Sequence, residues 1–213
     1  MKSVPVSFGT LLACILLAAP SLAGGKPSFD CAKADNDATK AVCASDALAE
    51  LDRELARLYH LAVSGQYMTP EREKELKATQ RGWIKGRDEC WKSDLGLETC
   101  IANEYAFRIH ELREGYADAR RDDGAGASLG PLAIVCKGFD AGISAVFVNT
   151  ADPMVSLKWN DSSIVLPRVG SASGAKYESD AWGGASSFWT QGKEALFTPP
   201  GGTELTCIVE EIG

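Results

Sequence analysis

The chain has 213 residues, with 22 Lys and Arg against 29 Asp and Glu, which gives a formal net charge of -7 at pH 7. This length allows one large or two small domains. The acidic balance argues against nucleic acid as a partner and favours a basic protein, since opposite net charges speed encounter and help to exclude wrong partners.

The first 23 residues have the features of a secretory signal peptide. Lys2 precedes an apolar run that ends before a small-residue cleavage site at Ala23, and this run is shorter than a membrane-spanning helix requires. We therefore predict an exported protein without a transmembrane segment, located in the periplasm. The alternative reads "LLAC" at 11–14 as a lipoprotein signal that places a lipid anchor on Cys14. We disfavour it because the apolar residues after Cys14 would then remain on the mature chain.

An even set of cysteines remains after removal of the leader: Cys31, Cys43, Cys90, Cys100, Cys136 and Cys207. In an oxidising compartment, such a set predicts disulfide bonds. The spacings contain no close Cys-x-x-Cys pair of the kind that binds zinc. We therefore expect neither a metal nor another cofactor.

Between residues 45 and 118 the apolar residues recur at helical spacing, which predicts three amphipathic helices. Ser45 is the expected N-cap of the first helix and Gly65 its end. Thr69, followed by a proline, is the expected N-cap of the second, and Cys100 is expected to open the third.

A short turn between the first two helices makes them antiparallel, which returns Cys90 to the neighbourhood of Cys31 and Cys43. Cys100 is expected at the same end of the bundle. Four cysteines allow three pairings, and the sequence does not choose among them.

The pattern changes after a stretch rich in Gly, Ser and charge at 119–131, which has the composition of a linker. Short β-prone runs follow, separated by Gly, Asp, Asn and Pro, and they predict an antiparallel barrel or sandwich. Cys136 lies in the first run and Cys207 in the last, so a disulfide would tie the two ends together. We predict an α+β protein of two domains: a disulfide-stapled helical domain at 24–118 and a β domain at 132–213.

The sequence offers little for catalysis. His60 and His110 each stand alone on a predicted helix, and we expect ordinary surface or half-buried side chains at both positions. The carboxylate pairs at 122–123 and 210–211 fall in the linker and at the terminus, where solvated charge is expected rather than an apolar pocket that would raise a pKa. Every cysteine of the exported chain has a disulfide partner available, so no free thiolate is expected. We predict that the protein is not an enzyme.

Two motifs in the β half carry a family resemblance. "SASGAKY" at 171–177 and "FWTQGKEAL" at 188–196 resemble the SxSGxxY and FWxKGxxAxL motifs of the membrane-bound and periplasmic inhibitors of c-type lysozyme. The similarity covers about residues 132–210. It implies an eight-stranded antiparallel barrel, with the loop around Ser173 entering the active-site cleft of the lysozyme.

The resemblance also implies a set of partner-binding residues: Ser173, Gly174, Tyr177, Trp189, Gln191 and Lys193. Ser173 is the matching hydroxyl donor, directed at the two carboxyl groups of the lysozyme. Gln191 replaces the lysine of the family motif, and Lys176 or Lys193 could supply a cation in its place. Because alternating aromatic residues are ordinary in strands, Tyr177 and Trp189 are expected in the core or rim of the barrel.

The connection at 178–187 is longer than expected for this family. Trp182 within it is expected either to contact the partner or to cover the mouth of the barrel.

The helical half resembles the N-terminal domain of the LprI-type lysozyme inhibitors over about residues 29–114. The residues that carry this resemblance are "FDCAKADNDATKAVCASDALAELDRELARLY", "LKATQRGWIKGRDEC" and "CIANEYAFRIHEL".

The two resemblances together predict an exported inhibitor of c-type lysozyme that protects peptidoglycan. The alternative is a non-catalytic cell-envelope module that binds peptidoglycan fragments or another wall hydrolase.

Overall fold

The computed structural model describes residues 25–121 and 124–211. The predicted signal peptide, Cys14 and the carboxylates of Asp122 and Asp123 lie outside the described residues.

The first half is helical, with three helices of 19 residues, α2 (Asp46–Ser64), α3 (Pro70–Asp88) and α4 (Leu97–Gly115). Two short α-helices, α1 (Asp37–Ala44) and α5 (Ala117–Arg120), and two 3-10 turns, η1 (Cys31–Lys33) and η2 (Cys90–Lys92), complete it. The three helices predicted between residues 45 and 118 are present, but a count of three for the helical domain is too low, because the described residues contain five α-helices. Helices of eight residues or fewer, such as α1 and α5, bury too few residues to give a clear 3.6-residue period.

The predicted boundaries of the first two long helices are confirmed. The Ser45 side chain accepts a hydrogen bond from the Leu48 N–H, and the Thr69 side chain accepts one from the Arg72 N–H. Gly65 is the C-cap of α2. The third long helix begins at Leu97, three residues before the cysteine that was expected to open it.

Two disulfides in the helical half settle the pairing that the sequence left open. Cys31 pairs with Cys43, and Cys90 pairs with Cys100. Each closes a short segment: the first ties η1 to α1 and the second ties η2 to α4.

The second half is a closed barrel in which each strand pairs antiparallel with the next and the last pairs with the first. The strands are β1 (Ser128–Cys136), β2 (Ile143–Val148), β3 (Met154–Trp159), β4 (Ser162–Val169), β5 (Ala175–Ser179), β6 (Ser186–Gln191), β7 (Glu194–Thr198) and β8 (Leu205–Glu211). The eight-stranded barrel is thus confirmed. Cys136 and Cys207 lie directly opposite each other on β1 and β8 and form the third disulfide.

Regular elements occupy both ends of the predicted linker range. Helix α5 ends at Arg120 and β1 already begins at Ser128. The ladder between β1 and β2 pairs Ser128 with Val148 and Leu129 with Phe147, so backbone pairing overrides the glycine-rich composition of this stretch.

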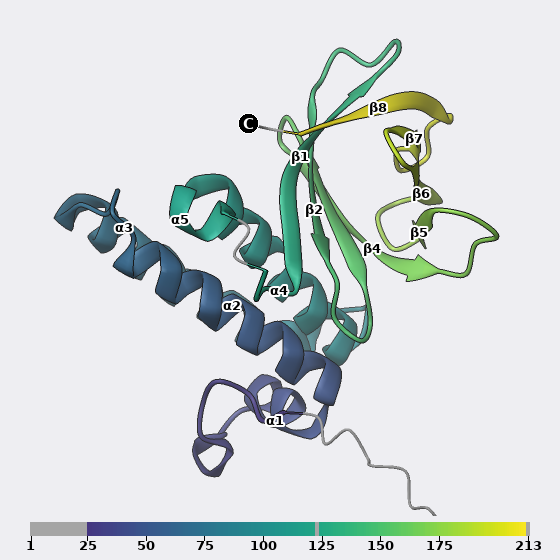
Figure 1. Cartoon of the computed structure of the whole chain (residues 1–213). Helices are drawn as coiled ribbons and strands as arrows, with labels where there is room; N and C mark the ends of the chain where they lie inside the picture. The colour runs from purple at the N-terminus through teal and green to yellow at the C-terminus, as the bar shows by residue number, and fades with distance from the viewer. Residues whose placement is uncertain (1–24, 122–123, 212–213) are drawn as a thin grey trace, which may run out of the picture.

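The helical half shares its apolar cluster with the outer face of the barrel, while the barrel has a separate core inside it. Inside the barrel, Phe188 and Phe197 pack with the inward side chains of the other strands. On the outer face of β2, β3 and β4, four buried side chains belong instead to the cluster formed by α2 and α4: Val146, Val148, Met154 and Val165. Helix α4 accordingly lies between α2 and the barrel (Figure 1).

Candidate functional site

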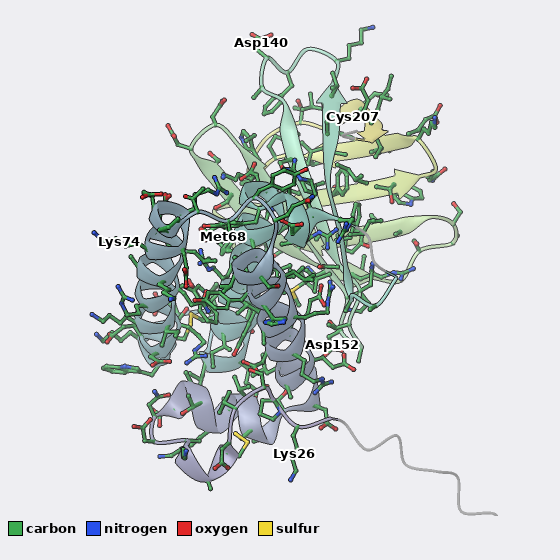
Figure 2. All side chains as sticks on the ribbon, turned by 60° about the vertical axis from the view of Figure 1, so that its left-hand side comes forward. Lys26, Met68, Lys74, Asp140, Asp152 and Cys207 are labelled. Carbon is green, nitrogen blue, oxygen red and sulfur yellow. A yellow bond between two sulfur atoms is a disulfide. The ribbon has the colours of Figure 1, made fainter. Side chains whose placement is uncertain are left out.

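The two motif segments meet at one end of the barrel. Because antiparallel strands alternate in direction, the β4–β5 connection at 170–174 and the β6–β7 turn at 192–193 lie at the same end as the β2–β3 connection. Asp152 belongs to that connection, whereas Asp140 belongs to the hairpin at the opposite end, and Figure 2 shows the two far apart.

Backbone carbonyls of the 170–174 segment accept hydrogen bonds that hold the segment against strand β6 and fix its own shape. The indole Nε1–H of Trp189 donates to the carbonyl of Ser173 at 2.9 Å, and the Ser171 hydroxyl donates to the carbonyl of Gly174 at 3.2 Å. Gly174 has a φ of 64°, and a Cβ at this position would lie 2.1 Å from the carbonyl oxygen of Thr190. Glycine is required here both for the left-handed backbone and for the close approach of the two segments.

The structure brings most of the predicted partner-binding residues to one surface. Ser173, Gly174, Gln191 and Lys193 are exposed, and a Cβ on Gly174 would lie 3.0 Å from the Gln191 Cγ. Trp189 is half-buried and supports this surface through its hydrogen bond to Ser173.

Tyr177 lies inside the barrel rather than on this surface. Only 2% of the residue is exposed, its ring packs 5.8 Å from that of Phe147, and burial raises the pKa of its hydroxyl. Strand alternation explains this placement, since Lys176 and Glu178 on either side of Tyr177 point outward and form an ion pair of 2.5 Å. The side chain of Tyr177 therefore supports the neighbouring loop from within.

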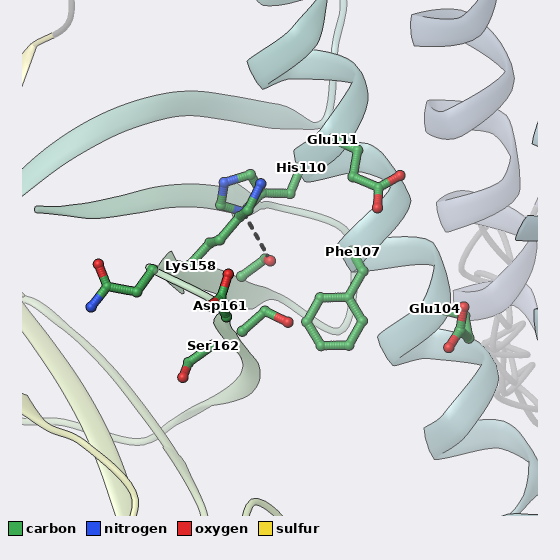
Figure 3. Close-up of a pocket in the computed structure, with 10 residues that line it drawn as sticks. Glu104, Phe107, His110, Glu111, Lys158, Asp161 and Ser162 are labelled. Atoms are coloured by element: carbon green, nitrogen blue, oxygen red, sulfur yellow. Dashed lines mark hydrogen bonds between the residues drawn. The ribbon is translucent and has the colours of Figure 1, made fainter. Parts of the chain in front are cut away.

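A second polar region lies between the two halves. A hollow of about 470 Å³ is lined by side chains of α4, including Glu104, Phe107 and Glu111, and by residues of β3 and β4. Figure 3 shows Lys158 and Asp161 on the strand side of this hollow. Burial, and then the nearby charge of Glu111, raise the pKa of Glu104.

His110 joins the helical half to the barrel at this hollow. Its Nδ1 lies 2.9 Å from the Ser156 Oγ and its Nε2 lies 2.8 Å from the Ser144 Oγ. Burial lowers the pKa of His110 to about 4, so the ring is neutral at pH 7, with one nitrogen donating and the other accepting. The expectation of a surface or half-buried histidine is therefore wrong, because only 2% of His110 is exposed.

Arg113 makes a second polar contact across the same interface. Its Nε donates to the Gly130 carbonyl at 2.6 Å, and its Nη1 donates to the Ser128 Oγ at 3.2 Å. The carboxylate of Glu54 on α2 accepts hydrogen bonds from the Ser128 hydroxyl and from the Ala127 N–H.

Trp182 adds an aromatic contact between the halves. Its ring packs edge to face against Phe107 with the centroids 5.7 Å apart, and its Nε1–H donates to the Val165 carbonyl at 2.7 Å. The long 178–187 connection thus folds over the outside of β4 and meets α4. This contact with α4 was not expected from the sequence, and Trp182 also packs against the apolar core inside the barrel.

Sequence reasoning missed this interface, although one signal for it exists. Strands exposed on one face alternate apolar and polar residues, whereas the runs "AVFV" at 145–148 and "IVL" at 164–166 are continuously apolar. Such runs indicate strands that are buried on both faces. Nothing in the local sequence identifies the partners, because Ser144 and Ser156 find His110 only through the tertiary fold.

All six cysteines in the described residues are in disulfides, and the ring nitrogens of His110 are both engaged by serine hydroxyls. Within residues 25–121 and 124–211, no group of three or more His, Cys, Asp or Glu side chains is placed to hold a metal ion. Among the described helices, none has the length and apolar character needed to cross a membrane.

Comparison with protein-family models assigns both halves to lysozyme inhibitors, families that are non-catalytic. Residues 31–112 match the family described as lysozyme inhibitor LprI. Residues 135–206 match MliC, the membrane-bound lysozyme-inhibitor of c-type lysozyme. The chain thus contains an LprI domain at 31–112 followed by a MliC lysozyme inhibitor domain at 135–206, which confirms the resemblances found in the sequence. Neither a curated protein nor a solved structure was found to match the chain.

Proposed function

We propose that the protein inhibits c-type lysozyme by inserting the 170–174 loop into the active-site cleft, and that it thereby protects peptidoglycan. The observation that carries this proposal is the fastening of the loop, in which Trp189 holds the Ser173 carbonyl and Gly174 packs against Thr190. A loop already held in one conformation loses little conformational entropy when it binds.

The exposed groups on this surface suit the target chemistry. A retaining glycosidase places two carboxyl groups about 5 Å apart in its cleft. The Ser173 hydroxyl and the Gln191 amide can each donate a hydrogen bond to such a carboxylate, and hydrogen bonds to charged acceptors are the stronger ones. Lys193, in the adjoining turn, is exposed and supplies a positive charge at the same end of the barrel.

We further propose that the protein acts outside the cytoplasm, in the periplasm or attached to the envelope. Its three disulfides are typical of an oxidising compartment. We retain residues 1–23 as a signal peptide followed by two domains, and place the division between these domains at 121–127 rather than 119–131, because α5 ends at Arg120 and β1 begins at Ser128. The apolar cluster that the helices share with the outer face of β2, β3 and β4 favours a single rigid body in which the 170–174 loop stays exposed.

The test is lysis of bacterial cell walls by a c-type lysozyme with increasing amounts of the purified protein. We expect stoichiometric protection that Ser173→Ala weakens by about tenfold to hundredfold, since a buried carboxylate would lose its donor. The matched control is Ser162→Ala, which removes an exposed hydroxyl at the opposite end of the barrel. If the wild-type protein binds muropeptides without slowing lysis, the envelope-binding alternative replaces this proposal.

A further inference from the structure

The outer face of the barrel beside the 170–174 loop carries a row of side chains that crosses four strands. Gln191 on β6 lies opposite Glu194 on β7, Glu194 lies opposite Ile208 on β8, and Ile208 lies opposite Val135 on β1. Residues directly opposite each other in a sheet project from the same face. Ile208 and Val135 are 56% and 51% exposed, so this row combines one carboxylate with an uncovered apolar pair.

A small hollow lies along this row, lined by Trp189, Gln191, Glu194, Leu196 and Thr206 among others. Its volume is about 140 Å³. Pockets for cofactors and metabolites are larger, roughly 300–1,000 Å³. The hollow therefore suits one side chain of a macromolecule rather than a free small molecule.

The charges around the hollow favour a cation. Among the described residues, the carboxylate of Glu194 forms no ion pair. The aromatic ring that lines the hollow is that of Trp189. The Lys176 ammonium lies 5.9 Å from its centroid, but this ammonium is already paired with Glu178 at 2.5 Å. Gln191, opposite Glu194, is neutral, whereas a lysine there would pair with the carboxylate across the two strands.

We propose that this hollow receives an arginine side chain of the lysozyme whose cleft holds the 170–174 loop. The identity of the partner rests on the proposed function. A guanidinium group can stack on Trp189 while it donates hydrogen bonds to Glu194, a combination that a lysine ammonium satisfies less well. The exposed Ile208 and Val135 would exclude water from the contact, as the apolar surroundings of strong interface residues do. The net charge of -7 on this chain complements a basic partner.

The first experiment compares Glu194→Gln with a matched variant, Glu204→Gln. Glu204 is also exposed and loses the same charge, but it precedes β8 at the opposite end of the barrel. We expect the Kd for a c-type lysozyme to rise about tenfold in Glu194→Gln and to stay within about twofold in Glu204→Gln, because the first variant removes a charge-assisted contact and the second only a distant charge.

A second experiment examines the hollow without lysozyme. The indole N–H signal of Trp189, assigned with Trp189→Phe, is followed by NMR during titration with N-acetyl-arginine amide. We expect a saturable shift at millimolar concentrations that is absent in Glu194→Gln. The uncharged probe N-acetyl-citrulline amide, which has nearly the same shape, should leave the signal in place.

The outcomes separate the two proposals. If the arginine probe shifts the Trp189 signal but the protein does not bind lysozyme, the proposed function is refuted, while the binding of a cation in the hollow is supported. If Glu194→Gln and Glu204→Gln bind lysozyme equally well, the arginine contact is refuted even where the loop still inhibits. Lysozyme affinity that depends on Glu194 and a response to arginine but not citrulline together support the proposal.

Discussion

Trp182 and Phe107 meet edge to face with their ring centroids 5.7 Å apart, one from the barrel and the other from helix α4. The contact joins elements 75 residues apart in sequence, and the indole N–H also reaches the carbonyl of Val165. Combined with the apolar cluster that α4 shares with β2, β3 and β4, it predicts that the two halves unfold together.

The first prediction is that Trp182→Ala lowers the free energy of unfolding by about 1–3 kcal/mol. This loss is smaller than that expected on removing a fully buried tryptophan side chain, because Trp182 is half-buried. The measurement is urea denaturation followed by circular dichroism. The control is Trp91→Ala. Because Trp91 is 60% exposed, this substitution should change the free energy of unfolding by no more than about 0.5 kcal/mol. Two separate transitions in the wild-type protein would contradict the single unit.

The second prediction concerns pH and His110. Burial lowers its pKa from 6.5 to about 4, with Glu114 opposing this shift and Lys158 adding to it. Between these two pH values the unfolded chain binds the proton more readily than the folded protein does. Stability from this group is therefore complete above about pH 6.5 and is lost as the pH falls toward 4, by on the order of 3 kcal/mol.

The test for His110 is the free energy of unfolding at several pH values between 4.5 and 7.5. The variant His110→Gln keeps a polar side chain that can bond to a serine hydroxyl but does not titrate. It should be less stable at pH 7 and should show a flatter dependence on pH. Equal slopes in the two proteins would show that other groups, such as the carboxyl group of Glu104 with its raised pKa, govern the acid sensitivity.

The third prediction tests the fastening of the loop. Gly174→Ala places a Cβ 2.1 Å from the Thr190 carbonyl and requires a left-handed φ, so the loop must shift away from β6. We expect inhibition of lysozyme to weaken at least about tenfold, since forcing such a conformation costs on the order of 1–3 kcal/mol before the clash is counted. Gly170→Ala, in the same connection, is the control, because a Cβ there meets no atom within 4 Å. Comparable inhibition by the two variants would place the inhibitory surface elsewhere.

The fourth prediction ranks the disulfides. Cys136–Cys207 closes a separation of 71 residues and Cys31–Cys43 one of 12. In the loop-entropy model these bonds stabilise the fold by about 4 and about 3 kcal/mol, respectively. Replacing the first pair with alanine should therefore lower the urea midpoint more than replacing the second. The reverse order would indicate that strain or residual structure in the unfolded chain outweighs loop entropy.

The long helices were predicted from the sequence, whereas the short ones were missed. Nineteen-residue helices repeat their apolar stripe several times, and caps such as Ser45 and Thr69 mark their ends through bonds to nearby backbone. Short α1 and α5 lack that repetition. The strands were recognisable, but alternation alone could not choose between a barrel and a sandwich, because closure depends on the pairing of β8 with β1.

The candidate loop could be located because its glycine and serine residues form a motif, whereas its supports are spread through the fold. Trp189 was predicted as a partner-binding residue or as part of the core or rim of the barrel, but the bond from its indole to the Ser173 carbonyl depends on the β5–β6 register. The burial of His110 between two serines required the docking of α4 on the barrel, which no local pattern specifies.

The closure of the barrel restricts how any partner can be recognised. In the described residues every strand has a neighbour on both sides, so this sheet offers no free edge to which an extended peptide could add as a further strand. A binding partner must therefore contact the connecting loops or the side chains that project from the outer wall. Both surfaces considered above, the 170–174 loop and the hollow beside Glu194, are of these two kinds.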